Sequence, residues 1–190
     1  MKSTSRKIYT RQGDKGETRI LSGEKVFKDE PRVKAYGALD ELQSHLGFAR
    51  VLAKQESVKP ILYAIQEDIF TASAELASTP EGLHRLKRRI NRENTKRLEY
   101  WIDEITAQYG LPRHFVVPGW SPDGAALHVA RAVCRRCERI IVTLNRSLGV
   151  YDELIVYFNR LGDLLFMVSW SLELVAVVEN VVQNLISDKS

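Results

Sequence analysis

Cysteine is scarce in this sequence, and several other common signals are missing from it. The 190 residues include two cysteines, Cys134 and Cys137, which are too few for a disulfide framework and typical of a reducing, cytoplasmic location. The first eight residues contain no apolar run, so we expect no signal peptide. The most apolar stretch, residues 164–182, carries Glu173 and Glu179, which favours a buried helix over a membrane span. The phosphate-loop pattern G-x-x-x-x-G-K-[ST] does not occur, which excludes that class of nucleotide site.

The composition that is present suits one globular domain with a sizeable core. Hydrophobic residues make up 44% of the chain, and the formal net charge is +4 at pH 7. We expect residues 1–190 to form a single domain, because a chain of this length buries a core without dividing. The mild charge does not by itself indicate nucleic acid, and we expect neither a nucleic-acid partner nor a membrane partner.

Five segments have apolar residues at helical spacing. They span residues 31–54, 58–78, 97–110, 122–149 and 151–186. The fourth has the clearest start, because Ser121 suits the N-cap and Pro122 the first helical position, whereas Gly162 is the weak point of the fifth. The chain shows no internal repeat and no convincing run of strands. We therefore predict an all-α, five-helix up-and-down bundle over 31–187, preceded by an irregular arm over 1–30.

A strongly basic segment, HRLKRRINRENTKR, runs from His84 to Arg97. Charge runs usually lie in solvent, so we interpret it as a loop followed by a solvated helical turn. A nucleic-acid surface is the alternative interpretation. The chain has no recognisable nucleic-acid-binding motif and no run of interleaved aromatic residues to support that alternative.

The predicted fourth helix carries charged side chains along one face. At about 100° per residue, five polar residues fall within an arc of roughly 100°. They are His128, Arg131, Arg135, Glu138 and Arg139. A neighbouring arc is apolar and marks the core side. Arginines at i, i+4 and i+8 repel one another, and two interpretations stay open. The face is either solvated with salt bridges to its neighbours, or completed by an anion that the planar guanidinium groups bind.

Two further patterns do not require a functional site. Cys134 and Cys137 have the spacing of a zinc or redox motif, but they lie on the apolar arc without further ligands, so we interpret them as core residues. Glu81 and His84 form a single Glu-x-x-His, whereas a di-iron bundle needs two of them on inward-facing helices. The sequence therefore assigns no metal-ligating residues.

The segment TRQGDKGETRI, from Thr10 to Ile20, has no strong helix or strand pattern. Gly13 and Gly16 permit backbone conformations from which consecutive N–H groups converge on an anion. The neighbouring Lys and Arg side chains would add positive charge. From these residues alone, a flexible arm and an anion-binding loop both stay open.

Together, these segments resemble the PduO-type ATP:cob(I)alamin adenosyltransferases. The similarity follows the family's order and covers most of residues 8–168. It rests on the segments YTRQGDKGETRI, KDEPRVKAYGALDELQSHLGFA, IQEDIFTASAELASTP, RLEYWIDEI, FVVPGWSPDGAALHVARAVCRRCERIIVTL and YFNRLGDLLF. The combination is specific, although no single pattern would be. Trp120 stands where a second glycine is usual, and beyond Trp170 the family's usual ending is not recognisable.

The resemblance implies a homotrimer in which ATP lies between the N-terminal arm of one subunit and the helices of its neighbour. The implied ATP contacts in the arm are Thr10, Arg11, Gln12, Gly13, Asp14, Lys15, Gly16, Thr18, Arg19 and Lys28. Those on the helices are Arg135, Arg136, Glu138, Arg139 and Asn159. Asp40 is similar to a carboxylate that pairs with Arg131, and these two residues and Arg135 are the candidates for a direct role in catalysis. Phe115 is similar to an aromatic residue that lies beneath the corrin and keeps its lower axial ligand away.

The implied reaction transfers the 5′-deoxyadenosyl group of ATP to cob(I)alamin and releases triphosphate. Cob(I)alamin is itself a strong nucleophile, so the protein needs no general base. It has to orient the 5′ carbon and to stabilise charge on the leaving triphosphate with Lys, Arg, N–H groups and Mg²⁺. A cob(II)alamin reductase and a cobalamin-dependent enzyme are the expected partners. The alternative functions are a cobalamin carrier that has lost catalysis and a basic nucleic-acid-binding protein.

Overall fold

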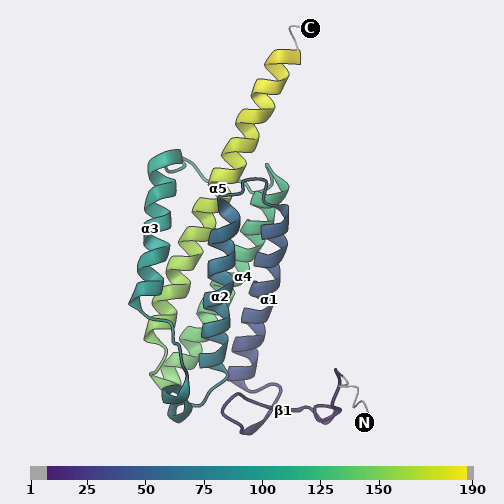
Figure 1. Ribbon diagram of the computed structural model, residues 1–190, viewed down its shortest axis with the longest axis vertical. Coiled ribbons are helices and arrows are strands. Elements are labelled where there is room, and N and C mark those ends of the chain that lie inside the picture. The colour runs from purple at the N-terminus through teal and green to yellow at the C-terminus, as the bar shows by residue number, and fades with distance from the viewer. Residues whose placement is uncertain (1–7, 188–190) are drawn as a thin grey trace, which may run out of the picture.

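The computed structural model describes residues 8–187 and consists mainly of five long α-helices (Figure 1). They are α1 (Pro31–Leu52), α2 (Val58–Leu76), α3 (Arg92–Tyr109), α4 (Pro122–Leu148) and α5 (Asp152–Ser187). A short 3₁₀ helix, η1 (Pro80–Arg85), lies between α2 and α3. Helix α5 packs against α3 and α4, and α1 packs against α2 and α4. The predicted all-α, five-helix bundle is confirmed, and η1 is an addition to it.

The core lies between these helices and follows the apolar spacing of the sequence. Leu42 of α1 and both Leu127 and Ile141 of α4 have no solvent exposure. Cys134 and Cys137 are buried in the same core as free thiols. Burial raises the pKa of Cys137 to about 12, so its thiol stays protonated and unreactive at neutral pH. The interpretation of both cysteines as core residues is therefore confirmed.

Capping residues fix the ends of the helices. The hydroxyl of Ser121 accepts a hydrogen bond from the N–H of Gly124 at 3.1 Å, which confirms the predicted N-cap of α4. Gly149 ends that helix in the left-handed conformation with a φ of 67°. Helix α1 begins at Pro31 as predicted, but its N-cap was not expected, because there the Glu30 carboxylate accepts hydrogen bonds from two N–H groups of the first turn. Helix α5 continues through Gly162 without a break, because packing on both sides outweighs the weak helix propensity of glycine.

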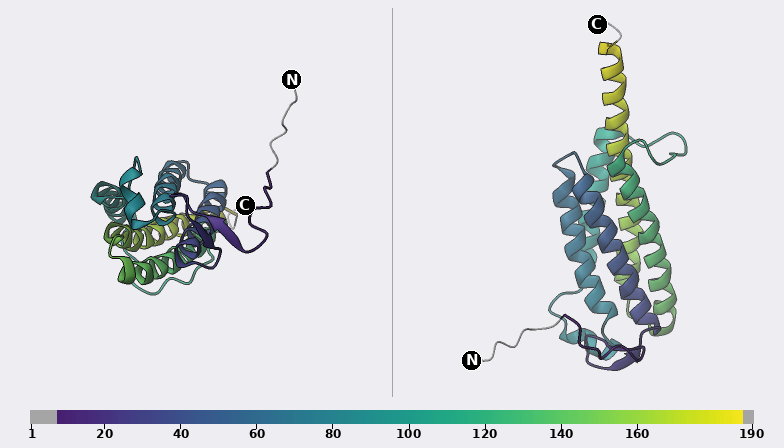
Figure 2. Two further views of the ribbon diagram at one scale, coloured as in Figure 1. Left: turned by 90° about the horizontal axis from the view of Figure 1, so that it is seen from below. Right: turned by 90° about the vertical axis from the view of Figure 1, so that its right-hand side faces the viewer.

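The N-terminal arm contains a short antiparallel hairpin of β1 (Glu17–Arg19) and β2 (Lys25–Phe27). The sequence predicted an irregular arm, because strands of three residues are too short to show an alternating pattern. The N–H of Leu21 donates a hydrogen bond of 2.7 Å to the carbonyl of Ala77 and attaches the arm to the end of α2. The hairpin consequently lies at the end of the bundle opposite the projecting end of α5 (Figure 2).

Two arginines of the basic segment pair with buried carboxylates of α2. The Nε of Arg89 lies 3.0 Å from Glu75, and Nη2 of Arg97 lies 2.5 Å from Asp68. Burial raises the pKa of Glu75, and hydrogen bonds from the backbone of Ile90 and from Arg89 oppose that shift. The predicted loop and helical turn are confirmed. These two arginines, however, attach the start of α3 to α2 instead of being merely solvated.

Helix α5 is the longest element, and its last turns project beyond the bundle (Figure 1). By length and composition alone it could cross a membrane, but 56% of its most apolar window is buried inside the bundle. Packing in the core accounts for that hydropathy, as the sequence predicts. The projecting turns have exposed apolar side chains at helical spacing. These are Val178, Val181, Val182, Leu185 and Ile186.

Candidate functional site

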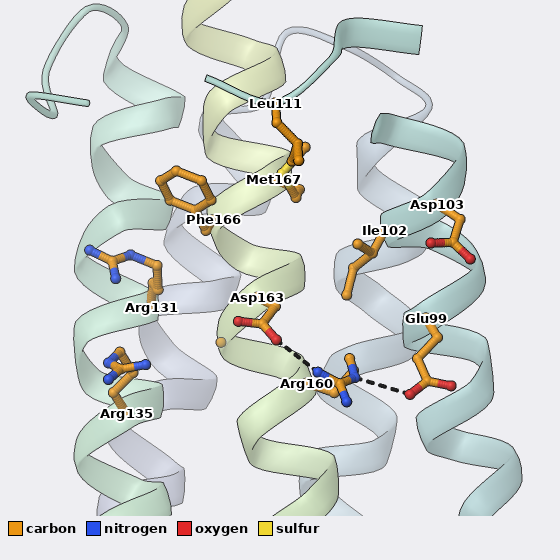
Figure 3. A pocket seen from close by; sticks show the side chains of 11 residues that line it. Glu99, Ile102, Asp103, Leu111, Arg131, Arg135, Arg160, Asp163, Phe166 and Met167 are labelled. Atoms are coloured by element: carbon orange, nitrogen blue, oxygen red, sulfur yellow. Dashed lines mark hydrogen bonds and ion pairs between the residues drawn. The ribbon is translucent and has the colours of Figure 1, made fainter. Parts of the chain in front are cut away.

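The arginines of α4 border a cleft between α3, α4 and α5, which Figure 3 shows from close by. The cleft has a volume of about 490 Å³. Arg131 and Arg135 lie one turn apart on its α4 side, and Phe166 of α5 lies beside Arg131. The guanidinium carbon of Arg131 is 5.9 Å from the centre of the Phe166 ring, a distance at which the ring attracts the cation. The aromatic ring thus helps to orient Arg131.

Three guanidinium groups on this face of α4 form no ion pair, although Glu99, Asp103 and Asp163 line the same cleft. The side chains of Arg131, Arg135 and Arg139 form no hydrogen bond or ion pair with any residue between 8 and 187. The neighbouring Arg136 and Arg160, by contrast, are paired with carboxylates of α1, α3 and α5. A row of unpaired arginines at one-turn spacing is destabilised by repulsion, and a polyanion would relieve it. The structure therefore favours the anion-binding interpretation of this face over a salt-bridged one.

The remaining helix residues of the predicted site fall into two groups. The Nδ2 of Asn159 donates a hydrogen bond of 3.0 Å to Glu138, which joins α5 to α4 beside the arginines. His128, placed on the polar arc by its spacing, is instead buried, and its Nε2 lies 3.5 Å from Oε2 of Glu173. Burial lowers the pKa of His128, while the Glu173 carboxylate opposes the shift. His128 therefore belongs to the edge of the core and not to the anion-binding face.

The glycine loop of the arm is closed by Lys28. The N–H of Gly16 donates to the carbonyl of Gly13 at 3.2 Å, and the N–H of Lys28 donates to the carbonyl of Gly16 at 2.8 Å. Gly16 has a φ of 79°, which favours glycine. A Cβ at Gly13 would lie 3.0 Å from the Nζ of Lys28, so the loop and the lysine form one compact unit. Thr18 of β1 is half-buried, and the other predicted side chains of the loop are exposed. These are Thr10, Arg11, Gln12, Asp14, Lys15 and Arg19.

Within one chain, the arm lies apart from Arg131 of α4. The chain that leaves the hairpin, residues 30–34, borders a pocket together with Thr143 near the end of α4. Arg131 precedes Thr143 by twelve residues, or about 18 Å of helix. Between residues 10–30 and α4, the described structure contains no hydrogen bond or ion pair. Arg139, a predicted ATP contact, lies only one turn before Thr143 and next to Ile140 of that pocket, so the arm is distant from Arg131 but not from the whole arginine row.

The predicted pair of Asp40 and Arg131 is not formed within the described chain. Asp40 is exposed on α1. Helix α1 flanks α4 on the side of Arg136, whose side chain pairs with Glu41. Arg131 and Arg135 face the cleft with α3 and α5 instead. The pair of Asp40 and Arg131 stays a prediction that requires a second subunit.

Phe115 lies on the loop between α3 and α4, at the end of the bundle from which α5 projects (Figure 2), and its side chain is fully exposed. The loop is held by Trp170 and Glu173 of α5, which hydrogen-bond to its backbone. Reasoning from the sequence missed both of these contacts. They join residues more than 50 positions apart, and no local pattern signals such a contact.

Comparison with known proteins identifies the family. The profile described as "Cobalamin adenosyltransferase" matches residues 8–172. The corrinoid adenosyltransferase of Citrobacter freundii is 46% identical over 160 residues, which are 84% of this chain and 91% of the relative. The corrinoid adenosyltransferase PduO of Salmonella typhimurium is 41% identical over 159 residues, but this chain spans only 47% of its length. The chain belongs to the cobalamin adenosyltransferase family, which confirms the resemblance seen in the sequence.

Solved structures agree with this assignment. A variant of the PduO-type ATP:corrinoid adenosyltransferase from Lactobacillus reuteri, complexed with cobalamin and ATP, matches with a TM-score of 0.80 and 35% identity. The match covers 87% of this chain and 92% of that chain. A second variant of that protein, complexed with ATP, matches with a TM-score of 0.80 and 34% identity over 91% of this chain and 96% of that chain. The fold of the part of the chain that the family profile matches, residues 8–172, is therefore that of the family.

Proposed function

We propose that this protein transfers the 5′-deoxyadenosyl group of ATP to cob(I)alamin and releases triphosphate. The observation that carries this proposal is the row of unpaired guanidinium groups on α4, of which Arg131 and Arg135 line the cleft and Arg139 follows one turn later. In a chain of this family, a polyphosphate is the anion that such a row is suited to bind. The bundle places these groups on a rigid helix, which favours precise orientation of the substrate.

The chemistry requires binding and charge stabilisation more than proton transfer. The electron pair on Co(I) forms a bond to the 5′ carbon of ATP, while the bond from that carbon to the triphosphate oxygen breaks and triphosphate leaves with its electron pair. Charge therefore develops on the leaving oxygen, next to the guanidinium groups that we propose as its ligands. Arg131 is oriented by the ring of Phe166, so its position is established before the substrate binds.

The described residues fit a magnesium ion that is carried by the nucleotide. Residues 8–187 contain no group of three or more His, Cys, Asp or Glu side chains placed to hold a metal. Magnesium commonly binds through one or two carboxylates and substrate phosphates. We propose that Mg²⁺ arrives on the triphosphate of ATP, where it neutralises part of the charge.

We further propose that the complete site forms between subunits of a homotrimer. The separation of the glycine loop from Arg131 within one chain supports this arrangement, because the loop would reach the cleft beside Arg131 only from a neighbouring subunit. Exposed Asp40 would then pair with Arg131 of the neighbouring subunit and align the two chains. Phe115, on its exposed loop, would lie beneath the corrin and exclude a lower axial ligand.

The expected partners follow from the substrate. Cob(I)alamin forms by one-electron reduction of cob(II)alamin, so we propose that a reductase supplies it and that a cobalamin-dependent enzyme receives the product. The free thiols of Cys134 and Cys137 suit the reducing cytoplasm, which we propose as the location. A nucleic-acid role is less supported, because Arg89 and Arg97 of the basic segment are engaged by Glu75 and Asp68.

The experiment that tests this function compares two arginine variants of α4 in an assay for adenosylcobalamin. Arg135→Ala removes one guanidinium from the proposed triphosphate site and is expected to lower kcat about 100-fold. Arg146→Ala removes an exposed arginine from the last turn of the same helix and is expected to leave kcat unchanged. Equal activity of the two variants would contradict the role of the arginine row. A wild-type protein that binds ATP and cobalamin without forming the Co–C bond would support the carrier function instead.

A further inference from the structure

The loop between α3 and α4 is fastened at both ends to a single turn of α5. At its start, Nε1 of Trp170 donates a hydrogen bond of 3.1 Å to the carbonyl of Gly110. At its end, Oε1 of Glu173 accepts hydrogen bonds from the N–H groups of Gly119 at 2.8 Å and Trp120 at 3.3 Å. Trp170 and Glu173 are three residues apart, so they lie on the same face of the helix. We call these two side chains the clasp.

Between the two fastened ends, the loop has no other hydrogen bonds that would hold its shape. Residues 111–118 form no helix or strand, and no hydrogen bond involves them within the described range 8–187. Leu111, Phe115 and Val117 are exposed, so their side chains are not held by packing. The clasp therefore fixes the two ends of the segment that carries Phe115, and these ends limit where Phe115 can lie.

The Glu173 carboxylate is buried, and this burial has to be compensated by its surroundings. Its side chain is 2% exposed, and burying a carboxylate is unfavourable unless it is well compensated. The compensation comes from the two loop N–H groups and from the N-terminal end of α4, where the helix dipole favours negative charge. A Cβ at Gly124 would lie 2.4 Å from Cγ of Glu173, so the first turn of α4 leaves room for this side chain. Its second oxygen lies 3.5 Å from Nε2 of His128.

The clasp also connects the loop to the arginine face. The ring of His128, which faces Glu173, makes an edge contact with Phe166 at 6.2 Å, and Phe166 in turn orients Arg131. Glu173 comes immediately after residues 8–172, which the family profile matches.

We propose that Glu173 and Trp170 are positioning residues, which hold the loop so that Phe115 lies in a fixed place against the lower face of the corrin. The proposal deepens the proposed function and rests on it, because Phe115 is assigned to the corrin there. Glu173 and Trp170 contact the loop backbone and not the substrate. Loss of the clasp should therefore weaken corrin binding while leaving ATP binding intact.

The test compares Glu173→Ala with Glu173→Gln, Trp170→Phe and a control. The glutamine variant retains an oxygen that accepts from Gly119 and Trp120, whereas the alanine variant leaves both N–H groups without a partner. Trp170→Phe removes only the indole N–H and retains an aromatic ring. Glu179→Ala removes an exposed carboxylate from the same helix and serves as the matched control.

We expect Glu173→Ala to raise the KM for cob(I)alamin about tenfold, which corresponds to about 1.4 kcal/mol for the lost hydrogen bonds. The KM for ATP should not change, and Glu173→Gln and Glu179→Ala should stay within about twofold of the wild type. Hydrogen exchange of the Gly119 and Trp120 amides, which donate to Glu173 in the wild type, should become faster in Glu173→Ala and Trp170→Phe but not in the control. A stable Glu173→Ala variant with wild-type exchange and wild-type KM for cob(I)alamin would overturn the proposal.

The two proposals fail in different ways. If the wild type forms no adenosylcobalamin, the proposed function is wrong, whereas hydrogen exchange of the loop still decides whether the clasp holds it. If Glu173→Ala does not fold, Trp170→Phe decides the question, because it leaves the buried carboxylate and its surroundings intact. Unchanged loop exchange and unchanged KM for cob(I)alamin in Trp170→Phe would then overturn the clasp.

Discussion

Replacing Asp68 by alanine should destabilise the bundle strongly, because this buried carboxylate joins three helices. Asp68 of α2 is 6% exposed. It accepts hydrogen bonds from Oη of Tyr157 at 2.9 Å, from Nδ2 of Asn94 at 2.9 Å and from Nη2 of Arg97 at 2.5 Å. The alanine variant would leave the fully buried Tyr157 hydroxyl without its acceptor and Arg97 without its counter-charge.

The magnitude follows from the exposure of each partner. An unsatisfied buried group costs about 1–3 kcal/mol, and breaking a buried ion pair costs about 3–5 kcal/mol. The side chain of Arg97 is 41% exposed, so water replaces part of its interaction, and we expect a total loss of about 3 kcal/mol. For a chain of this size that loss lowers Tm by about 6–12 °C.

Urea and thermal unfolding followed by circular dichroism measure this effect. Asp68→Asn retains one acceptor oxygen and should lose about half as much stability. Glu104→Ala, which removes an exposed carboxylate from α3, should change the free energy of unfolding by less than about 0.5 kcal/mol. A decrease in Tm of less than about 2 °C for Asp68→Ala would refute the reasoning.

Three further predictions concern α4 and α5. Gly162→Ala should raise the free energy of unfolding by about 0.5–1 kcal/mol in urea titrations, because alanine favours the helix more than glycine does. The new Cβ fits, since it would lie at an ordinary contact distance of 3.7 Å from Cγ of Arg135. A destabilised variant would contradict this prediction. Burial lowers the pKa of His128 below its usual value of 6.5, and the charge of Arg131 adds to this shift. The Glu173 carboxylate opposes it. The unfolded state therefore takes up a proton that the folded state resists, and stability should decrease as the pH falls below about 6.5. His128→Gln should show a smaller decrease between about pH 7.5 and about pH 5.5, and an identical slope would refute the assignment. Burial also raises the pKa of both cysteine thiols, so neither should react with a thiol reagent until the protein is unfolded.

The helices were predictable from the sequence because their signals are local. Apolar spacing located all five, Ser121 occupies the N-cap position that the sequence predicts, and α4 ends at Gly149, where the predicted segment ends. The hairpin was missed, since its strands have three residues each. The N-cap role of Glu30 was missed as well, because glutamate is not among the favoured residues at that position.

The candidate site was predictable only in part, because some of its contacts join residues that lie far apart in the sequence. The spacing of Arg131 and Arg135 placed them on one face of a helix, where the structure shows them. The same spacing placed His128 among them, because an arc on a helical wheel does not reveal which flank a neighbouring helix covers. The hydrogen bond between Glu173 and the loop joins residues 54 positions apart. No pattern in the sequence indicates that these residues meet in the folded chain.

The most direct test of the central claim is complementation between subunits. A chain with Arg135→Ala and a chain with Lys28→Glu are each expected to be nearly inactive in forming adenosylcobalamin. Oligomers assembled at random from a 1:1 mixture of the two chains should together recover about one quarter of the wild-type activity. This fraction is the share of boundaries that combine an intact arm from one chain with an intact arginine row from the other. Recovery at that level is the result we predict, and no recovery in verified mixed oligomers would contradict a site shared between chains.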